Sequence, residues 1–147
     1  MKLLSILFPV LLVLASSMQA QNIKTKADTK ALADKAMQMV VNKDIKGSFE
    51  LYRKFWPIPD SELDELINLT QSQLLEGPLS ERFGAILSFE PVDVKNLGES
   101  LVRYTYILKM ENTAMRWSII FYKGKDNWMV NYVYWDDKIQ LIFDEVQ

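Results

Sequence analysis

Three runs of β-branched and aromatic residues in the C-terminal third constrain the fold of this chain most strongly. They span residues 101–110, 115–122 and 128–135, and short polar segments separate them. Such runs predict strands, and short polar gaps between them predict antiparallel hairpins. Residues 85–95 predict a further strand, in which Pro91 favours an edge position or a bulge. The C-terminal part of the chain is therefore expected to form an antiparallel sheet.

The two hairpin turns predict which side chains share a face of this sheet. If Met110 faces Met115 and Lys123 faces Trp128, both turns give the same alternation of side chains. One face is then almost wholly apolar or aromatic, and it collects Val102, Tyr104, Tyr106, Leu108, Met110, Met115, Trp117, Ile119, Phe121, Trp128, Val130, Tyr132 and Tyr134. The opposite, mixed face carries polar residues together with Ile107, Ile120, Tyr122, Val133 and Trp135.

Hydrophobic periodicity predicts three helices before the sheet, over residues 27–42, 45–55 and 61–76. Residues 79–84 predict one further helical turn or a loop, and residues 139–146 a short strand or a helical tail. Helices followed by antiparallel strands are typical of an α+β domain. We expect three N-terminal helices packed on the apolar face of a curved antiparallel sheet of about four strands.

The N-terminus has the pattern of a secretory signal peptide, predicted over residues 1–20. Lys2 supplies the positive charge, residues 3–15 are mostly apolar, and residues 16–20 are small and polar, with cleavage expected after Ala20. Ser17 offers a second cleavage position. An uncleaved membrane anchor is the alternative, although the apolar run is short for a bilayer span of about 20 residues. After cleavage we expect no stable membrane span.

The amino-acid composition limits the cellular compartments and the kinds of partner that we expect. The chain lacks cysteine, so it forms no disulfide and carries no lipid attachment site of the lipoprotein type. We expect secretion, into the periplasm of a Gram-negative bacterium. Without Lys2, the chain from Gln21 carries 16 of the 17 basic residues against 19 acidic ones, net −3. This balance lacks the basic footprint of a nucleic-acid-binding protein, so we expect no nucleic-acid partner.

The order of elements resembles the NTF2-like (cystatin-like α+β) superfamily, in particular small secreted members of uncharacterised function. Residues 116–122 (RWSIIFY) and 126–130 (DNWMV) are similar to the aromatic strand, turn and following strand found in such proteins. The resemblance implies one domain over residues 21–147, with a cone-shaped cavity between helices and sheet. It also implies a homodimer through the outer sheet face, where Ile107, Ile120, Tyr122, Val133 and Trp135 are the interface candidates.

The chain also lacks histidine, which excludes several kinds of site. Ser-His-Asp and Cys-His nucleophiles are impossible, and the common zinc and copper ligand sets are missing. No glycine-rich phosphate-binding motif occurs. We therefore expect no cofactor and no metal.

The aromatic face allows two interpretations: its side chains pack under the helices, or they line a cavity for a small apolar or aromatic molecule. The pocket candidates are Glu90, Tyr104, Tyr106, Trp117, Tyr132 and Tyr134. A non-catalytic domain that binds such a ligand, or a protein partner, is the first hypothesis. The alternative is an isomerase or dehydratase in which Glu90, turned inward at Pro91, works as acid or base with a tyrosine. That alternative fails if Glu90 is exposed on an edge strand.

Overall fold

The computed structural model describes residues 22–145, so the predicted signal peptide lies outside the described residues. Helices come first along the chain: α1 (Lys26–Val41), α2 (Ile45–Arg53), α3 (Asp60–Gln71), the π-helical turn η1 (Ser72–Glu76) and α4 (Pro78–Phe83). Four strands follow: β1 (Ile86–Leu97), β2 (Leu101–Met110), β3 (Ala114–Lys123) and β4 (Trp128–Asp136). A short helix, α5 (Gln140–Glu145), comes last.

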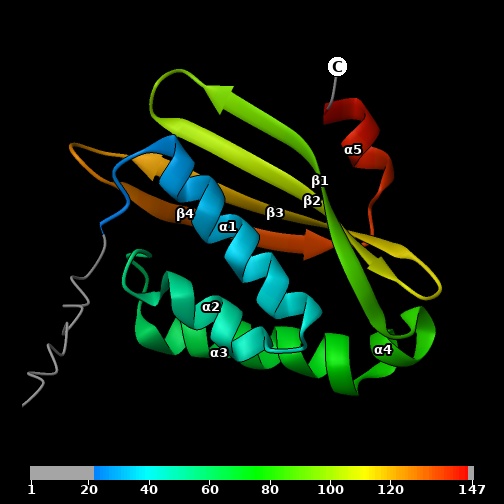
Figure 1. The fold of residues 1–147 in the computed structure, drawn as a ribbon. Coiled ribbons are helices and arrows are strands. Elements are labelled where there is room, and N and C mark those ends of the chain that lie inside the picture. Colours follow the sequence, from blue (N-terminus) through cyan, green and yellow to red (C-terminus); the bar gives the residue numbers. More distant parts are fainter. Residues whose placement is uncertain (1–21, 146–147) are drawn as a thin grey trace, which may run out of the picture.

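The expected α+β class, with helices before a four-stranded antiparallel sheet, is confirmed. The strands form a meander in the order β1-β2-β3-β4 (Figure 1). The helices differ from the expected three. Pro78, which suits the first position of a helix, starts α4 after Gly77, and the tail after β4 is helical. Among residues 22–145, no helix combines the length and the apolar character that a bilayer span requires.

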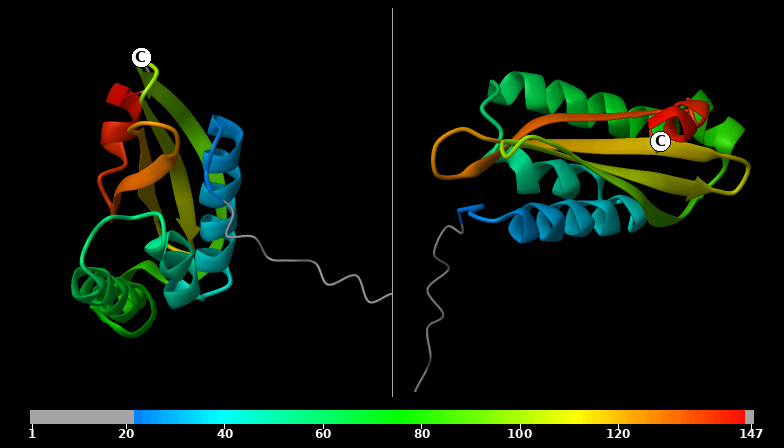
Figure 2. Two further views of the ribbon diagram at one scale, coloured as in Figure 1. Left: turned by 90° about the vertical axis from the view of Figure 1, so that its left-hand side faces the viewer. Right: turned by 90° about the horizontal axis from the view of Figure 1, so that it is seen from above.

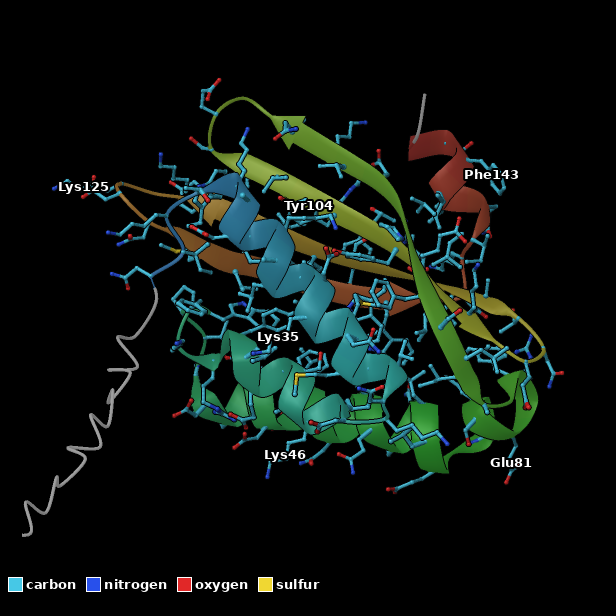
Figure 3. All side chains as sticks on the ribbon, viewed as in Figure 1. Lys35, Lys46, Glu81, Tyr104, Lys125 and Phe143 are labelled. Carbon is cyan, nitrogen blue, oxygen red and sulfur yellow. The ribbon has the colours of Figure 1, made fainter. Side chains whose placement is uncertain are left out.

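The helices lie on both sides and along one edge of the sheet. Figure 2 shows α1 on one face and α5 on the opposite face. Helix α3 runs below β4, along that edge of the sheet (Figures 1 and 2). Tyr104 points from the sheet toward α1, whereas Phe143 of α5 lies on the far side (Figure 3). The apolar face is thus covered by α1 and α2 rather than by the expected three helices, because α3 lies along the β4 edge.

The first hairpin has the predicted faces but a different register. Leu108 lies opposite Met115 and Lys109 opposite Ala114, two residues away from the predicted pairing of Met110 with Met115. The turn is tighter than expected because the amide of Met110 donates to the carbonyl of Thr113, at 2.9 Å. A shift of two residues leaves every side chain on its face. Pairing Met110 with Met115 would place the like charges of Lys109 and Arg116 opposite each other, and the observed register separates them.

The second hairpin starts in the predicted register and then departs from it. Lys123 pairs with Trp128 and Phe121 with Val130, but Ile120 then pairs with Tyr132, and Asn131 is left over. One extra residue in a strand is a β-bulge, and it reverses the faces of everything beyond it.

The bulge makes four of the predicted orientations wrong. Val133 and Trp135 turn toward the helices, and Tyr132 and Tyr134 turn to the outer face. The exposed fraction is 4% for Val133 and 56% for Tyr132. Two residues predicted to line the pocket are therefore on the outer face, and two predicted interface residues belong to the helix-covered face.

Trp117 of β3 lies at the centre of the core. Its indole stacks on that of Trp135 with ring centroids 6.3 Å apart, and the ring of Phe49 from α2 is 6.1 Å away. The Trp135 Nε1 donates to the hydroxyl of Thr70 on α3, at 3.1 Å. Trp117 thus connects β3, β4 and α2 within one buried aromatic cluster.

Strand β1 is the edge strand that Pro91 predicts, and its pairing with β2 is irregular between Pro91 and Asp93. The irregularity does not turn Glu90 inward. Glu90 lies opposite Ile107 on the outer face, and its carboxylate forms an ion pair with Lys109 at 2.6 Å. The Glu90 side chain is 52% exposed.

Candidate functional site

The structure separates the six predicted pocket residues into two groups. Tyr104, Tyr106 and Trp117 are buried between the sheet and the helices, as the sequence predicts. Glu90, Tyr132 and Tyr134 lie on the outer face. An exposed Glu90 on an edge strand is one of the two positions that the sequence allows, whereas the sequence predicts both tyrosines on the apolar face. No acid–base pair of Glu90 with a tyrosine forms in the described residues.

A carboxylate other than that of Glu90 accepts a hydrogen bond from one of the buried tyrosines. The Tyr106 hydroxyl donates to Asp34 Oδ1 of α1 at 2.8 Å, and Lys30 forms an ion pair with the same carboxylate. The Tyr104 hydroxyl contacts the Thr29 hydroxyl at 2.8 Å and donates to the Lys26 carbonyl at 3.0 Å. Burial raises the pKa of the Tyr106 phenol well above its ordinary value, and the hydrogen bond to Asp34 raises it further. Tyr106 thus stays a protonated donor at neutral pH.

Sequence reasoning missed Asp34 because it treated the charged residues of this helix as its solvent face. The available signal was the spacing of Lys30 and Asp34, which puts both on one side of a helix. That spacing identifies an ion pair but gives no information about the strand it faces.

Three buried polar atoms on the α2 and β3 side have no hydrogen-bond partner among the described residues: Ser48 Oγ, Tyr52 Oη and Trp117 Nε1. Tyr52 is completely buried on α2, and burial raises the pKa of its phenol far above the ordinary value. A buried hydroxyl without a partner costs about 1–3 kcal/mol of stability.

Tyr52→Phe and Tyr106→Phe are expected to have opposite effects on stability. Tyr52→Phe should leave the free energy of unfolding unchanged or raise it by up to about 1 kcal/mol, because no hydrogen bond is lost. Tyr106→Phe should lower it by about 1–2 kcal/mol, because Asp34 loses a donor. Urea unfolding followed by tryptophan fluorescence measures both. Equal losses for the two variants would contradict the assignment of partners.

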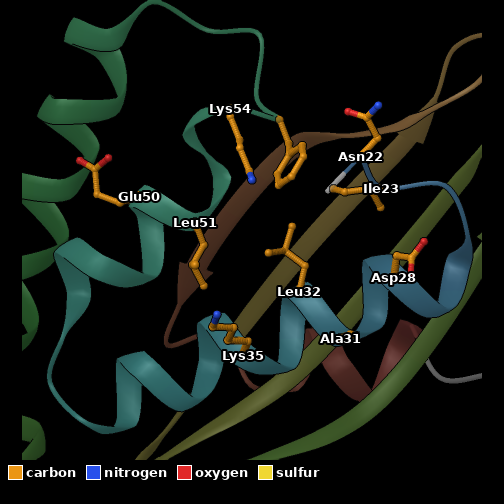
Figure 4. Close-up of a pocket in the computed structure, with 10 residues that line it drawn as sticks. Asn22, Ile23, Asp28, Ala31, Leu32, Lys35, Glu50, Leu51 and Lys54 are labelled. Carbon is orange, nitrogen blue, oxygen red and sulfur yellow. The ribbon is translucent and has the colours of Figure 1, made fainter. Parts of the chain in front are cut away.

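The structure contains a groove of about 500 Å³ between α1, the end of α2 and the segment before α1 (Figure 4). Its apolar lining comes from Ile23, Ala31, Leu32, Leu51 and Phe55. The helical spacing of Leu32, Ala36, Met39 and Val40 predicts that these four residues form the buried stripe of α1. The structure confirms Ala36 and Val40 as buried, buries Ala33 and Met37 as well, and leaves Leu32 half-buried at the groove. The groove is a feature that sequence reasoning did not identify.

The two acidic residues of the groove, Asp28 and Glu50, already accept hydrogen bonds from other groups of the protein. Asp28 accepts from the amides of Lys24 and Thr25 at 3.1 and 2.9 Å and so caps α1, and these hydrogen bonds lower its pKa. Glu50 accepts from Arg53 Nε and Nη2 at 2.7 and 2.8 Å, and that contact lowers its pKa. Both carboxylates are ionised at neutral pH; the charge of Glu50 is offset by Arg53, whereas the Asp28 carboxylate is held by backbone amides.

The two lysines of the groove have no such partner. Within residues 22–145, neither Lys35 nor Lys54 forms an ion pair with a carboxylate, and Lys54 Nζ lies 4.7 Å from the centre of the Phe55 ring. Figure 4 shows both side chains turned toward the groove, with Leu32 and Leu51 between them. The groove therefore presents apolar surface and two unpaired ammonium groups.

On the outer face, the structure pairs a buried arginine with an acidic residue. The Arg116 guanidinium donates to Asp136 Oδ1 and Oδ2 at 3.2 and 2.6 Å, and it lies 5.1 Å from the centre of the Tyr134 ring. The arginine side chain is 7% exposed and that of Asp136 25%. Ile107, Ile120 and Tyr122 are on this face too, as predicted.

Possible metal ligands do not cluster among the described residues. Among residues 22–145, no three acidic side chains come together in the way a metal site requires. Comparisons with protein-family models, with curated proteins and with solved structures found no match.

Proposed function

We propose that this chain is a non-catalytic binding domain of the NTF2-like type, exported by its signal peptide, whose ligand is a small apolar or aromatic anion. The observation that carries the proposal is the pair of unpaired lysines, Lys35 and Lys54, beside the apolar lining of the α1–α2 groove. The volume of about 500 Å³ lies within the range of small-molecule sites. The element order supports the NTF2-like type.

The charges of the groove favour an anionic ligand over a neutral or cationic one. Arg53 offsets the charge of Glu50, and backbone amides already hold the Asp28 carboxylate. Within residues 22–145 the Lys35 and Lys54 ammonium groups are the charged groups of the groove that make no hydrogen bond, so they are the ones a ligand can engage. A carboxylate or sulfonate between Lys35 and Lys54 gains charge-assisted hydrogen bonds, while its apolar body covers Leu32, Leu51 and Phe55.

Two fluorescent probes of similar shape test this proposal. We expect the protein to bind the anionic 8-anilinonaphthalene-1-sulfonate at least about tenfold more tightly than the neutral N-phenyl-1-naphthylamine, which lacks the sulfonate. In the double variant Lys35→Glu, Lys54→Glu this preference should disappear. Fluorescence titration at low and high salt gives the dissociation constants.

A matched control is the double variant Lys46→Glu, Lys125→Glu, which makes the same change in net charge at two exposed lysines outside the groove (Figure 3). This variant should keep the preference for the anionic probe. If it weakens anion binding as much as Lys35→Glu, Lys54→Glu does, the effect is one of net charge and the groove is not the site.

The alternative of an isomerase or dehydratase using Glu90 loses its structural basis, because Glu90 is exposed and paired with Lys109. The homodimer through the outer face stays a prediction. Its candidate contacts are Ile107, Ile120 and Tyr122, since Val133 and Trp135 face the helices.

A further inference from the structure

The second half of β4 is an open sheet edge that borders a groove. Six consecutive residues, Tyr132 to Asp137, line a groove of about 420 Å³ together with Met115 of β3, and the opposite wall comes from Leu66, Leu69, Gln73, Leu79 and Phe83. Alternate residues of a strand point to opposite faces, so six consecutive residues reach one groove only along the backbone edge. The groove therefore runs beside the main chain of β4.

Along the first half of the same edge, other segments of this chain accept the hydrogen bonds of the outward-pointing amides. The amides of Trp128 and Val130, which point away from β3, donate to the carbonyls of Ile23 and Phe55 at 2.8 and 2.9 Å. These two carbonyls thus occupy the positions that a neighbouring strand would take.

Within the described part of the chain, the second half of this edge has no equivalent partner. Val133 and Trp135 share the sheet face of Trp128 and Val130, so beyond the bulge their amides point to the same edge. Within residues 22–145, no loop carbonyl or side chain accepts a hydrogen bond from either amide. The other edge of the sheet is protected, because β1 contains Pro91 and two irregularities.

We propose that an extended segment of a partner protein adds to this edge as a fifth strand, between β4 and α3. Main-chain hydrogen bonds to Val133 and Trp135 would hold the segment, and alternate apolar side chains would contact Leu69 and Tyr132, which are 52% and 56% exposed. Asp137 at the end of the groove is exposed and selects a segment with a basic end, whereas the neighbouring Asp136 is held by Arg116.

The position of α3 favours a single strand over a second copy of this chain. Helix α3 lies along the β4 edge, where the sheet of a second copy would continue (Figures 1 and 2). The groove between them has room for a few residues of extended chain, and adjacent strands need a spacing of about 4.8 Å.

The probe is a labelled synthetic peptide of about six residues that alternates valine and threonine and begins with two lysines. In the favoured antiparallel pairing its N-terminal lysines lie next to Asp137. Fluorescence anisotropy should show binding, and moving the lysines to the C-terminus should weaken it about tenfold.

N-methylation of the peptide separates strand addition from contact through side chains alone. Every second amide of a bound peptide strand points toward β4, and methyl groups on those amides should reduce affinity at least about tenfold. Methyl groups on the remaining amides, which point away from β4, should leave the affinity within about twofold. Leu69→Asp should reduce affinity about tenfold, and Leu87→Asp, an equally exposed leucine on β1, should not.

Three results would overturn the proposal: no binding at millimolar peptide, equal effects of the two methylation sets, or an unchanged affinity in Leu69→Asp. Size-exclusion chromatography tests the competing occupant. A dimer that the peptide dissociates would assign the edge to a second copy of the chain instead.

Discussion

Trp117→Ala is expected to lower the free energy of unfolding by about 3–5 kcal/mol, the largest effect of any single substitution proposed for this protein. The Trp117 side chain is 1% exposed and contacts both Trp135 and Phe49, so its removal leaves a cavity that helices and sheet cannot easily fill. Domains of this size are typically stable by about 5–15 kcal/mol, so the variant should lose a large part of its stability. Urea denaturation followed by circular dichroism measures the change.

Tyr132→Ala is the matched control for Trp117→Ala. Simple alternation along the strands puts both side chains on the helix-covered face, but the β-bulge at Asn131 turns Tyr132 outward. The expected loss is below about 1 kcal/mol, mainly from the contact with Tyr134, whose ring centroid is 5.7 Å away. A loss as large as that of Trp117→Ala would show that the bulge is absent.

The second large effect is expected at the ion pair of Arg116 with Asp136. Asp136→Asn keeps the shape of the side chain but removes the charge that faces a nearly buried guanidinium. We expect a loss of about 2 kcal/mol at neutral pH, between the values typical of exposed and fully buried pairs. Glu90→Gln is the control, because the pair of Glu90 with Lys109 is about half exposed on both sides, and its loss should stay below about 0.5 kcal/mol.

The same ion pair predicts how stability depends on pH. Burial raises the pKa of Asp136, but hydrogen bonds from Arg116 and the Lys138 amide, with the charges of Arg116 and Lys138, outweigh it and hold the pKa below its usual 3.8. A carboxylate with a lowered pKa in the folded state stabilises the protein above the unfolded pKa, and this stabilisation is lost as the pH falls through the folded one. Between about pH 5 and pH 2 the wild type should lose its advantage over Asp136→Asn. If the free energies of unfolding of the wild type and Asp136→Asn instead changed in parallel over that pH range, the Arg116–Asp136 pair would not be the source of the pH dependence.

Strand content was predictable because the aromatic and β-branched runs are long and their boundaries are polar. The faces of β2 were correct even though the register of the first hairpin was off by two residues, because the alternation of side chains does not change with an even shift. The bulge at Asn131 had no counterpart in the sequence pattern. An odd shift of one residue gives a pattern that is as apolar on one face as the correct one, since Tyr132, Val133, Tyr134 and Trp135 are all large and partly apolar.

The groove between α1 and α2 could not be predicted for a similar reason. Periodicity places Leu32 on the apolar side of α1, but it gives no information about how far the neighbouring helix extends. Leu32, Leu51 and Phe55 come together at the groove because α2 ends at Arg53 and the chain then returns to β4, where the Phe55 carbonyl accepts from Val130.

The sequence by itself determined the α+β class, the strands, the faces of β2 and β3 and the absence of histidine and cysteine chemistry. These properties depend on residue types and on local periodicity, which a single chain displays directly. Only the tertiary structure decided that Asp34 rather than Glu90 partners a tyrosine, that Lys35 and Lys54 flank a groove, and that the end of β4 is open. Each of these depends on which surfaces distant segments present to one another, and hydrophobic patterns alone leave that undetermined.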